Sequence, residues 1–130
     1  MRMLLDTHAF LWMQTTPELL GADARALVED GANELLLSAV SSWEIAIKYR
    51  LGKLELPQSP EIYVPSRAAA VGVTALPVEH SHALRVAQLP AHHRDPFDRL
   101  LIATAQVEAV PVLTADPVFS RYGVDVLPAS

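Results

Sequence analysis

No cysteine occurs in the 130 residues of this sequence, which excludes disulfide bonds, a thiolate nucleophile and cysteine-ligated zinc. Long apolar runs are also missing. The charge-free stretch 68–78, which no other exceeds, is far shorter than the roughly 18–20 residues of a membrane span and contains Gly72 and Pro77. Repeats and Gly/Ser-rich linkers are absent, and 51% of the residues are hydrophobic, enough to fill a core. We therefore expect one domain over residues 1–130 and no membrane partner.

Basic residues are few: 10 Lys and Arg stand against 15 Asp and Glu, giving a formal net charge of −5. A protein that binds nucleic acid usually has a basic surplus, so this balance argues against nucleic acid if the acidic residues are spread over the surface. The first apolar residues are interrupted by Asp6 and His8, so we expect no signal peptide and, by default, a cytoplasmic location.

Short apolar runs alternate with segments of helical periodicity. The predicted strands are 3–5, 35–38, 73–76, 110–114 and 124–127. The predicted helices are 9–14, 21–30, 42–51, 60–71 with a kink or break at Pro65, 81–88 and 96–107. This alternation favours an α/β fold, a single domain with a central, mostly parallel sheet of four to five strands flanked by helices. The order of the strands is left open.

Five carboxylates share one kind of position in this pattern. Asp6 ends the first strand and Asp116 lies two residues past the fourth. Glu44 is expected in the first turn of the helix after the second strand, and Asp95 and Asp98 begin the helix 96–107. The carboxyl ends of parallel strands and the following helix N-termini meet at one sheet edge, so these acids should lie close together. Such a cluster is costly without a cation, and its all-oxygen donors favour Mg²⁺ or Mn²⁺, the usual ions of phosphoryl chemistry.

Each carboxylate but one has a purely structural alternative. Glu44 could complete a capping box with Ser41 or pair with Lys48 one turn on. Asp6 is the exception, because an acid that closes an apolar strand needs a partner for its charge.

The other three acids could serve local structure alone. Asp95 could be only the N-cap of its helix, and Asp98 could only complement the helix dipole. Asp116, which precedes Pro117, could be a turn residue. Without the five carboxylates, 10 acidic residues balance 10 basic ones, so the proposed metal site accounts for the whole acidic surplus.

Four segments around these residues resemble the PIN-domain family, and within it the VapC-type toxins of VapBC toxin–antitoxin pairs with an Asp-Pro-Phe-Asp motif. The matching segments are 4–8 (LLDTH), 41–48 (SSWEIAIK), 93–103 (HRDPFDRLLIA) and 113–116 (LTAD). The resemblance implies a PIN-like fold, an endoribonuclease that depends on one or two Mg²⁺ or Mn²⁺ ions, an RNA substrate, a VapB-type antitoxin and a homodimer.

The resemblance also implies roles for individual residues. Asp6, Glu44, Asp98 and Asp116 correspond to the catalytic, metal-binding quartet, with Asp95 as a possible further ligand. Thr7 and Thr114 resemble hydroxyl residues that orient carboxylates or water, although a strand-end hydroxyl bonded to the backbone is an equal alternative. The available phosphate contacts are Lys48, Arg50, Lys53, Arg94 and the supporting residue Arg99. A solvated helix face explains the first three equally well.

The roles of five aromatic residues stay open in the sequence. His8, His92 and His93 lie beside acids and are candidates to contact phosphate. Trp12 and Trp43 are candidates to stack on bases, with core packing the favoured alternative.

Two other functions compete with a nuclease. A PIN fold that binds RNA or a partner without turnover would be expected to lack some of the acids, and all are present. A phospho-acceptor signalling domain would have paired acids after the first strand, an acid after 73–76 and a late lysine. Asp6 is single, 73–76 ends without an acid and no lysine follows Lys53, so we disfavour that function.

Overall fold

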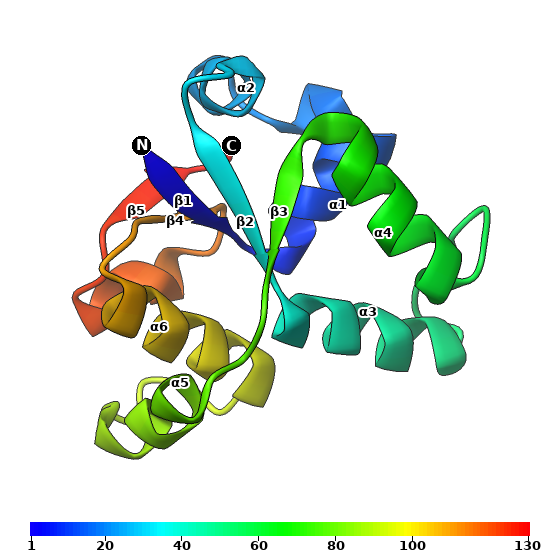
Figure 1. Ribbon diagram of the computed structural model, residues 1–130. Helices are drawn as coiled ribbons and strands as arrows, with labels where there is room; N and C mark the ends of the chain where they lie inside the picture. The colour runs from blue at the N-terminus through cyan, green and yellow to red at the C-terminus, as the bar shows by residue number, and fades with distance from the viewer.

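Five short strands form one parallel sheet in the computed structural model, which describes residues 1–130 (Figure 1). Their bounds are β1 Arg2–Leu5, β2 Glu34–Ser38, β3 Val73–Leu76, β4 Val112–Thr114 and β5 Val126–Pro128. Every strand pair is parallel, and the order across the sheet is β3-β2-β1-β4-β5. The predicted parallel α/β architecture is confirmed.

Six α-helices and three 3-10 helices connect the strands. The α-helices are α1 Thr7–Thr15, α2 Ala22–Glu29, α3 Ala39–Arg50, α4 Pro60–Val71, α5 His80–Arg85 and α6 Pro96–Glu108. The 3-10 helices are η1 Pro17–Leu19, η2 Val86–Gln88 and η3 Pro117–Tyr122. No helix combines the length and the apolar character needed to cross a membrane.

The side chains of β1 alternate between two apolar layers, because successive residues of a strand point to opposite faces. Met3 and Leu5 pack with Phe10 of α1 and Val64 of α4 on one face. Leu4 packs on the other face with residues of α6 and η3. Figure 1 shows α1 and α4 on one side of the sheet and α5 and α6 on the other.

The strand order creates a switch point between β1 and β4. From β1 the chain adds β2 and then β3 on one side, and it later returns to add β4 and β5 on the other side. Ligands of open parallel sheets bind outside the strand carboxyl ends at such a reversal, because the connections leave there in opposite directions. Asp6 follows β1 and Asp116 follows β4, so both lie at this point.

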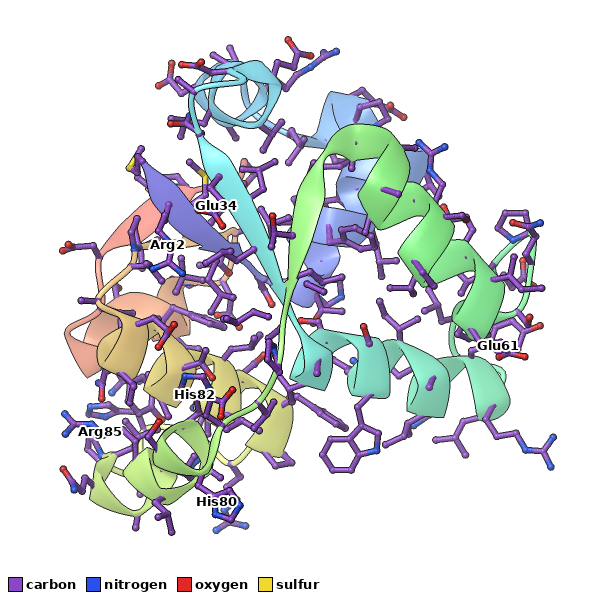
Figure 2. The ribbon with its side chains drawn as sticks, in the orientation of Figure 1. Arg2, Glu34, Glu61, His80, His82 and Arg85 are labelled. Atoms are coloured by element: carbon purple, nitrogen blue, oxygen red, sulfur yellow. The ribbon has the colours of Figure 1, made fainter.

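α6 is fixed in place by a buried histidine from α5. His82 is 1% exposed; its Nδ1 accepts from the backbone N–H of Glu79 at 3.0 Å, and its Nε2 lies 3.3 Å from Glu108 of α6. Figure 2 shows His82 in α5, beside α6. Glu108 also meets Arg2, which pairs with Glu34 at the start of β2. These contacts hold the far end of α6 against the sheet.

Several predicted bounds are wrong in detail. The strand predicted at 124–127 is β5 at Val126–Pro128, and the helix predicted at 81–88 ends at Arg85, where the 3-10 helix η2 follows. α3 begins at Ala39 and not at 42, because Ser38 at the end of β2 caps it by accepting from the backbone N–H of Val40 at 3.1 Å. β4 begins at Val112 and not at 110, because the backbone N–H of Val110 bonds to Ala105 and still belongs to the end of α6. α4 continues through Pro65, so the predicted break is absent, and the kink stays a prediction.

Candidate active site

Asp6 is a buried acid that follows β1 directly and caps α1. Its Oδ1 accepts from the backbone N–H of Thr7 at 2.7 Å, and its Oδ2 accepts from the Thr114 hydroxyl at 2.8 Å. Burial raises the pKa of Asp6, and the charge of Glu44 adds to this effect. The two hydrogen bonds and the nearby His8 offset it only in part. The negative charge of the buried Asp6 carboxylate would therefore be stabilised by a nearby cation.

The two threonines that the resemblance singles out have different roles. Thr114 ends β4, and besides donating to Asp6 its Oγ1 accepts from the backbone N–H of Asp116 at 3.0 Å. Thr7 donates its hydroxyl to Ser41 at 2.8 Å and so ties α1 to α3. Ser41 is fully buried, and the sequence had suggested it only as a helix cap.

Glu44 lies in the second turn of α3, so the expected first-turn position and the capping box with Ser41 are both wrong. Its side chain is buried, and its Oε2 accepts a charge-assisted hydrogen bond from Lys48, the partner predicted one turn on. Its Oε1 is buried with no hydrogen-bond partner. An unsatisfied carboxylate oxygen in a buried position is costly, and a cation would satisfy it.

Asp95 and Asp98 open α6 as predicted. Asp95 is the N-cap: its Oδ1 accepts from the backbone N–H groups of Phe97 and Asp98 at 2.9 and 3.1 Å. Asp98 is the third helical residue, its side chain is 17% exposed, and its Oδ2 lies 3.6 Å from Nε2 of His93. Burial raises the pKa of Asp98 to about 8, together with the negative charges of the other carboxylates, Asp95, Asp6, Glu44 and Asp116.

The charges of the other four predicted carboxylates all contribute to the raised pKa of Asp98, after burial. Asp116 is exposed and caps η3 by accepting from the backbone N–H of Val118, so it does serve the turn that was its structural alternative. Its charge nevertheless acts on Asp98, as do the charges from β1, α3 and the N-cap of α6. Four chain segments thus deliver negative charge to one place at the switch point.

The donor chemistry of this site fits a hard divalent cation. No group of three or more His, Asp or Glu side chains is arranged as a metal cluster in the structure. The oxygens are nonetheless those that Mg²⁺ and Mn²⁺ prefer, Glu44 Oε1 has no partner, and burial raises the pKa of Asp6 and Asp98. A cation would satisfy Glu44 Oε1 and stabilise the charged forms of Asp6 and Asp98.

A network of His93, Arg99 and Tyr122 borders the acids, and sequence reasoning did not find it. The Tyr122 hydroxyl lies 2.6 Å from Nδ1 of His93 and accepts from the His93 backbone N–H at 3.1 Å. The Arg99 guanidinium donates to the same hydroxyl at 3.3 Å and to the carbonyl of Pro90 at 2.8 Å. Arg99, predicted to support a phosphate, therefore holds the segment before α6.

An exposed tryptophan and a half-buried phenylalanine form a pair next to the acids. Trp43 of α3 meets Phe97 of α6 edge to face, with ring centroids 5.1 Å apart. Trp43 is 57% exposed, so the favoured core packing is wrong for this residue. Its neighbour in sequence is Glu44, and the neighbour of Phe97 is Asp98. A second edge-to-face contact joins His92 to Tyr122.

A five-stranded parallel sheet with acids at its switch point defines an α/β domain built to bind a ligand at its strand carboxyl ends. The sequence pattern of the PIN domain matches residues 3–125. The chain therefore belongs to the PIN domain family, which confirms the resemblance drawn from the motifs.

Known proteins resemble this chain in sequence and in structure. Ribonuclease VapC16 of Mycobacterium tuberculosis is 52% identical over 67 residues, a match that covers 48% of each chain, about half the length of that relative. VapBC2 from Rickettsia felis, bound to a promoter DNA fragment, aligns over 100% of both chains with a TM-score of 0.74 at 13% identity. DNA-bound VapBC from Salmonella typhimurium gives 0.70 at 16% identity, over 100% of this chain and 99% of that one. The two structures share the fold of this protein.

Proposed function

We propose that this protein is a divalent-metal-dependent endoribonuclease, the toxin of a type II toxin–antitoxin pair acting in the cytoplasm as a single PIN domain over residues 1–130. The sequence match to a ribonuclease supports the reaction class. The observation that carries the proposal is the pair of buried acids at the switch point, Asp6 held by Thr114 and Glu44 with an oxygen that has no hydrogen-bond partner. Burial, and then the charges of the four other carboxylates, raise the pKa of Asp98 beside them to about 8. An uncompensated acidic cluster at a ligand-binding edge is the arrangement that metal-assisted phosphodiester hydrolysis needs.

Asp6, Glu44, Asp98 and Asp116 are the residues that would hold one or two Mg²⁺ or Mn²⁺ ions. Asp95 is the weaker candidate, since its Oδ1 already accepts two backbone N–H groups. When bound, such an ion polarises the scissile phosphate and makes water a better nucleophile.

The protein's own groups then have defined tasks. Thr114 fixes the orientation of the Asp6 carboxylate through its hydroxyl. The N-cap bonds of Asp95 fix the first turn of α6 and so the position of Asp98. Burial of Asp6 and Glu44 keeps water from screening their charges, which strengthens their interaction with a cation.

The proposed partners are a VapB-type antitoxin and a second copy of this chain. The named structural neighbours are VapBC assemblies, which supports an antitoxin. Co-purification with the product of a short upstream reading frame, and the mass of the complex by light scattering, would test both partners.

The test of the reaction is cleavage of single-stranded RNA by the metal-stripped protein with Mn²⁺ or with EDTA. We expect cleavage only with Mn²⁺, and a loss of at least about 100-fold in Asp6→Asn. Asp23→Asn is the matched control, because Asp23 is exposed on α2, away from the site. Cleavage by Asp6→Asn at the wild-type rate would overturn the mechanism. RNA binding without any cleavage by the wild type would favour the alternative, a PIN fold that binds without turnover.

A further inference from the structure

A cavity of about 290 Å³ opens beside the carboxylates, between α1, α3 and the turn after α3. Glu44 and Thr7 form the wall that it shares with the acidic site. Three aliphatic side chains form another part of the lining: Leu11, Ile45 and Leu54. Its volume lies at the low end of ligand pockets, so it suits one nucleotide-sized group.

Both lysines of this chain line the cavity. The sequence contains eight arginines spread along its length, but only Lys48 and Lys53 carry an ammonium group. His8 lies in the same lining, and Glu44 is the only carboxylate there. The cavity is therefore a basic pocket directly beside an acidic site.

The end of α3 places the two lysines together. The backbone N–H of Lys53 bonds to the carbonyl of Lys48 at 2.9 Å, and that of Gly52 bonds to Tyr49 at 3.1 Å. These are the two bonds of a Schellman motif, which requires a left-handed residue, and Gly52 has φ +73°. A dedicated turn thus brings Lys53 back beside the last turns of its helix.

The two lysines differ in their present partners. Lys48 donates to Glu44, and its ammonium also interacts with the charges of Asp95 and Asp98. Lys53 makes no ion pair in the structure. Glu44 uses Oε2 for Lys48 and leaves Oε1 without a partner, so a cation bound at Oε1 would neutralise the charge that holds Lys48 and repel its ammonium.

We propose that the cavity lined by Lys48 and Lys53 is a subsite for an RNA phosphate next to the one that is cleaved. Lys53 contacts this phosphate at all times, and Lys48 joins it when a divalent cation occupies Glu44. The aliphatic wall packs against the attached ribose. This inference rests on the proposed function, since it assigns RNA as the ligand of the neighbouring site.

The experiment measures binding of a cleavage-resistant, 2′-O-methylated single-stranded oligoribonucleotide by fluorescence anisotropy over a range of salt. With Mn²⁺ we expect Lys53→Met to weaken binding about 3- to 10-fold and to lower the slope of log K against log salt by about 0.7, the value for one phosphate contact on a single strand. Arg25→Met is the matched control: Arg25 is exposed on α2 and outside the cavity, so its loss should change affinity less than 2-fold. Equal losses in the two variants, or none in either, would overturn the subsite.

The proposed movement of Lys48 from Glu44 to the RNA phosphate is tested separately. Lys48→Met should weaken RNA binding with Mn²⁺ but not with EDTA, where Glu44 holds Lys48. Calorimetry should show tighter Mn²⁺ binding in Lys48→Met than in Lys53→Met, although the two variants lose the same charge. Weaker Mn²⁺ binding in Lys48→Met than in Lys53→Met would contradict this movement of Lys48. Because the RNA probe resists cleavage, these results do not depend on turnover. If the wild type cleaves RNA and Lys53→Met binds RNA as tightly as the wild type, the subsite is wrong but the proposed function stands.

Discussion

The Thr114 hydroxyl donates a 2.8 Å hydrogen bond to the Asp6 carboxylate across 108 residues of sequence. This bond joins the ends of β1 and β4, the two strands that meet where the strand order reverses. The same oxygen accepts from the backbone N–H of Asp116. One buried hydroxyl therefore positions an acid from each of the two strands.

Replacing this hydroxyl should damage the site more than the fold. In Thr114→Val the shape is kept but Asp6 loses a donor, which should raise the pKa of Asp6 further and lower RNA cleavage by about 10- to 100-fold, as for other residues that orient metal ligands. The free energy of unfolding should fall by about 1–2 kcal/mol. Thr114→Ser restores the donor and should recover most of the activity. Full activity in Thr114→Val would show that this bond does not orient Asp6.

Asp98 should make the metal-free protein less stable as the pH rises. Its carboxyl keeps a proton to a pH of about 8 in the folded state, whereas an Asp in an unfolded chain loses it near pH 4. Between these values the folded state binds more protons, so the free energy of unfolding falls as the pH increases. Asp98→Asn removes this titration, and we expect a flatter pH profile and a Tm at pH 8 a few degrees above that of the metal-free wild type.

Mn²⁺ provides the control for this prediction. It should raise the Tm of the wild type, because it binds only the folded state, and should have much less effect on Asp98→Asn. A variant that melts well below the metal-free wild type would instead assign Asp98 a structural role.

Removing the Tyr122 hydroxyl should loosen the segment before α6. This hydroxyl serves both His93 and Arg99, so Tyr122→Phe leaves polar groups without a partner and should cost about 1–2 kcal/mol in chemical denaturation. Tyr49→Phe is the control, because Tyr49 lies on the surface of α3 and should stay within about 0.5 kcal/mol of the wild type. Equal effects in the two variants would argue against the network.

Gly52→Ala tests the turn that places Lys53. Nothing lies within 4 Å of an added Cβ at Gly52, so the cost comes from its φ of +73° and should be about 1 kcal/mol. Gly31→Ala also meets open space but has no such backbone angle, and should be nearly neutral. A Gly52→Ala variant as stable as Gly31→Ala would mean that the turn tolerates a side chain.

The sequence was sufficient for the parallel sheet, because short apolar strands follow from local periodicity. It also put Asp6, Asp95, Asp98 and Asp116 at strand and helix ends, where they lie. That these acids form one metal site stays a prediction. The strand order was not accessible, since it depends on which apolar faces pack together. The start of α3 was misplaced because Ser38, Ser41 and Ser42 are all acceptable caps, and only the structure selects Ser38.

The network around Tyr122 could not be predicted for a different reason. Tyr122 and His93 are 29 residues apart, and Tyr122 lies in a 3-10 helix with no periodic signal. In the sequence, His92, His93 and Arg94 were candidates only for phosphate contacts, and nothing there indicated Tyr122 as a partner. Trp43 was assigned to the core because tryptophan is usually well buried, whereas its contact with Phe97 leaves it largely exposed.

The central claim is that these carboxylates hold a divalent cation. Calorimetric titration of the metal-stripped protein with Mn²⁺ at pH 7, in buffers of different ionisation enthalpy, tests it most directly. We expect saturable binding with release of about one proton, because Asp98, with a pKa of about 8, must lose its proton to bind metal. Asp98→Asn should bind at least 10-fold more weakly and release less. Binding by Asp98→Asn with wild-type affinity and proton release would contradict the account.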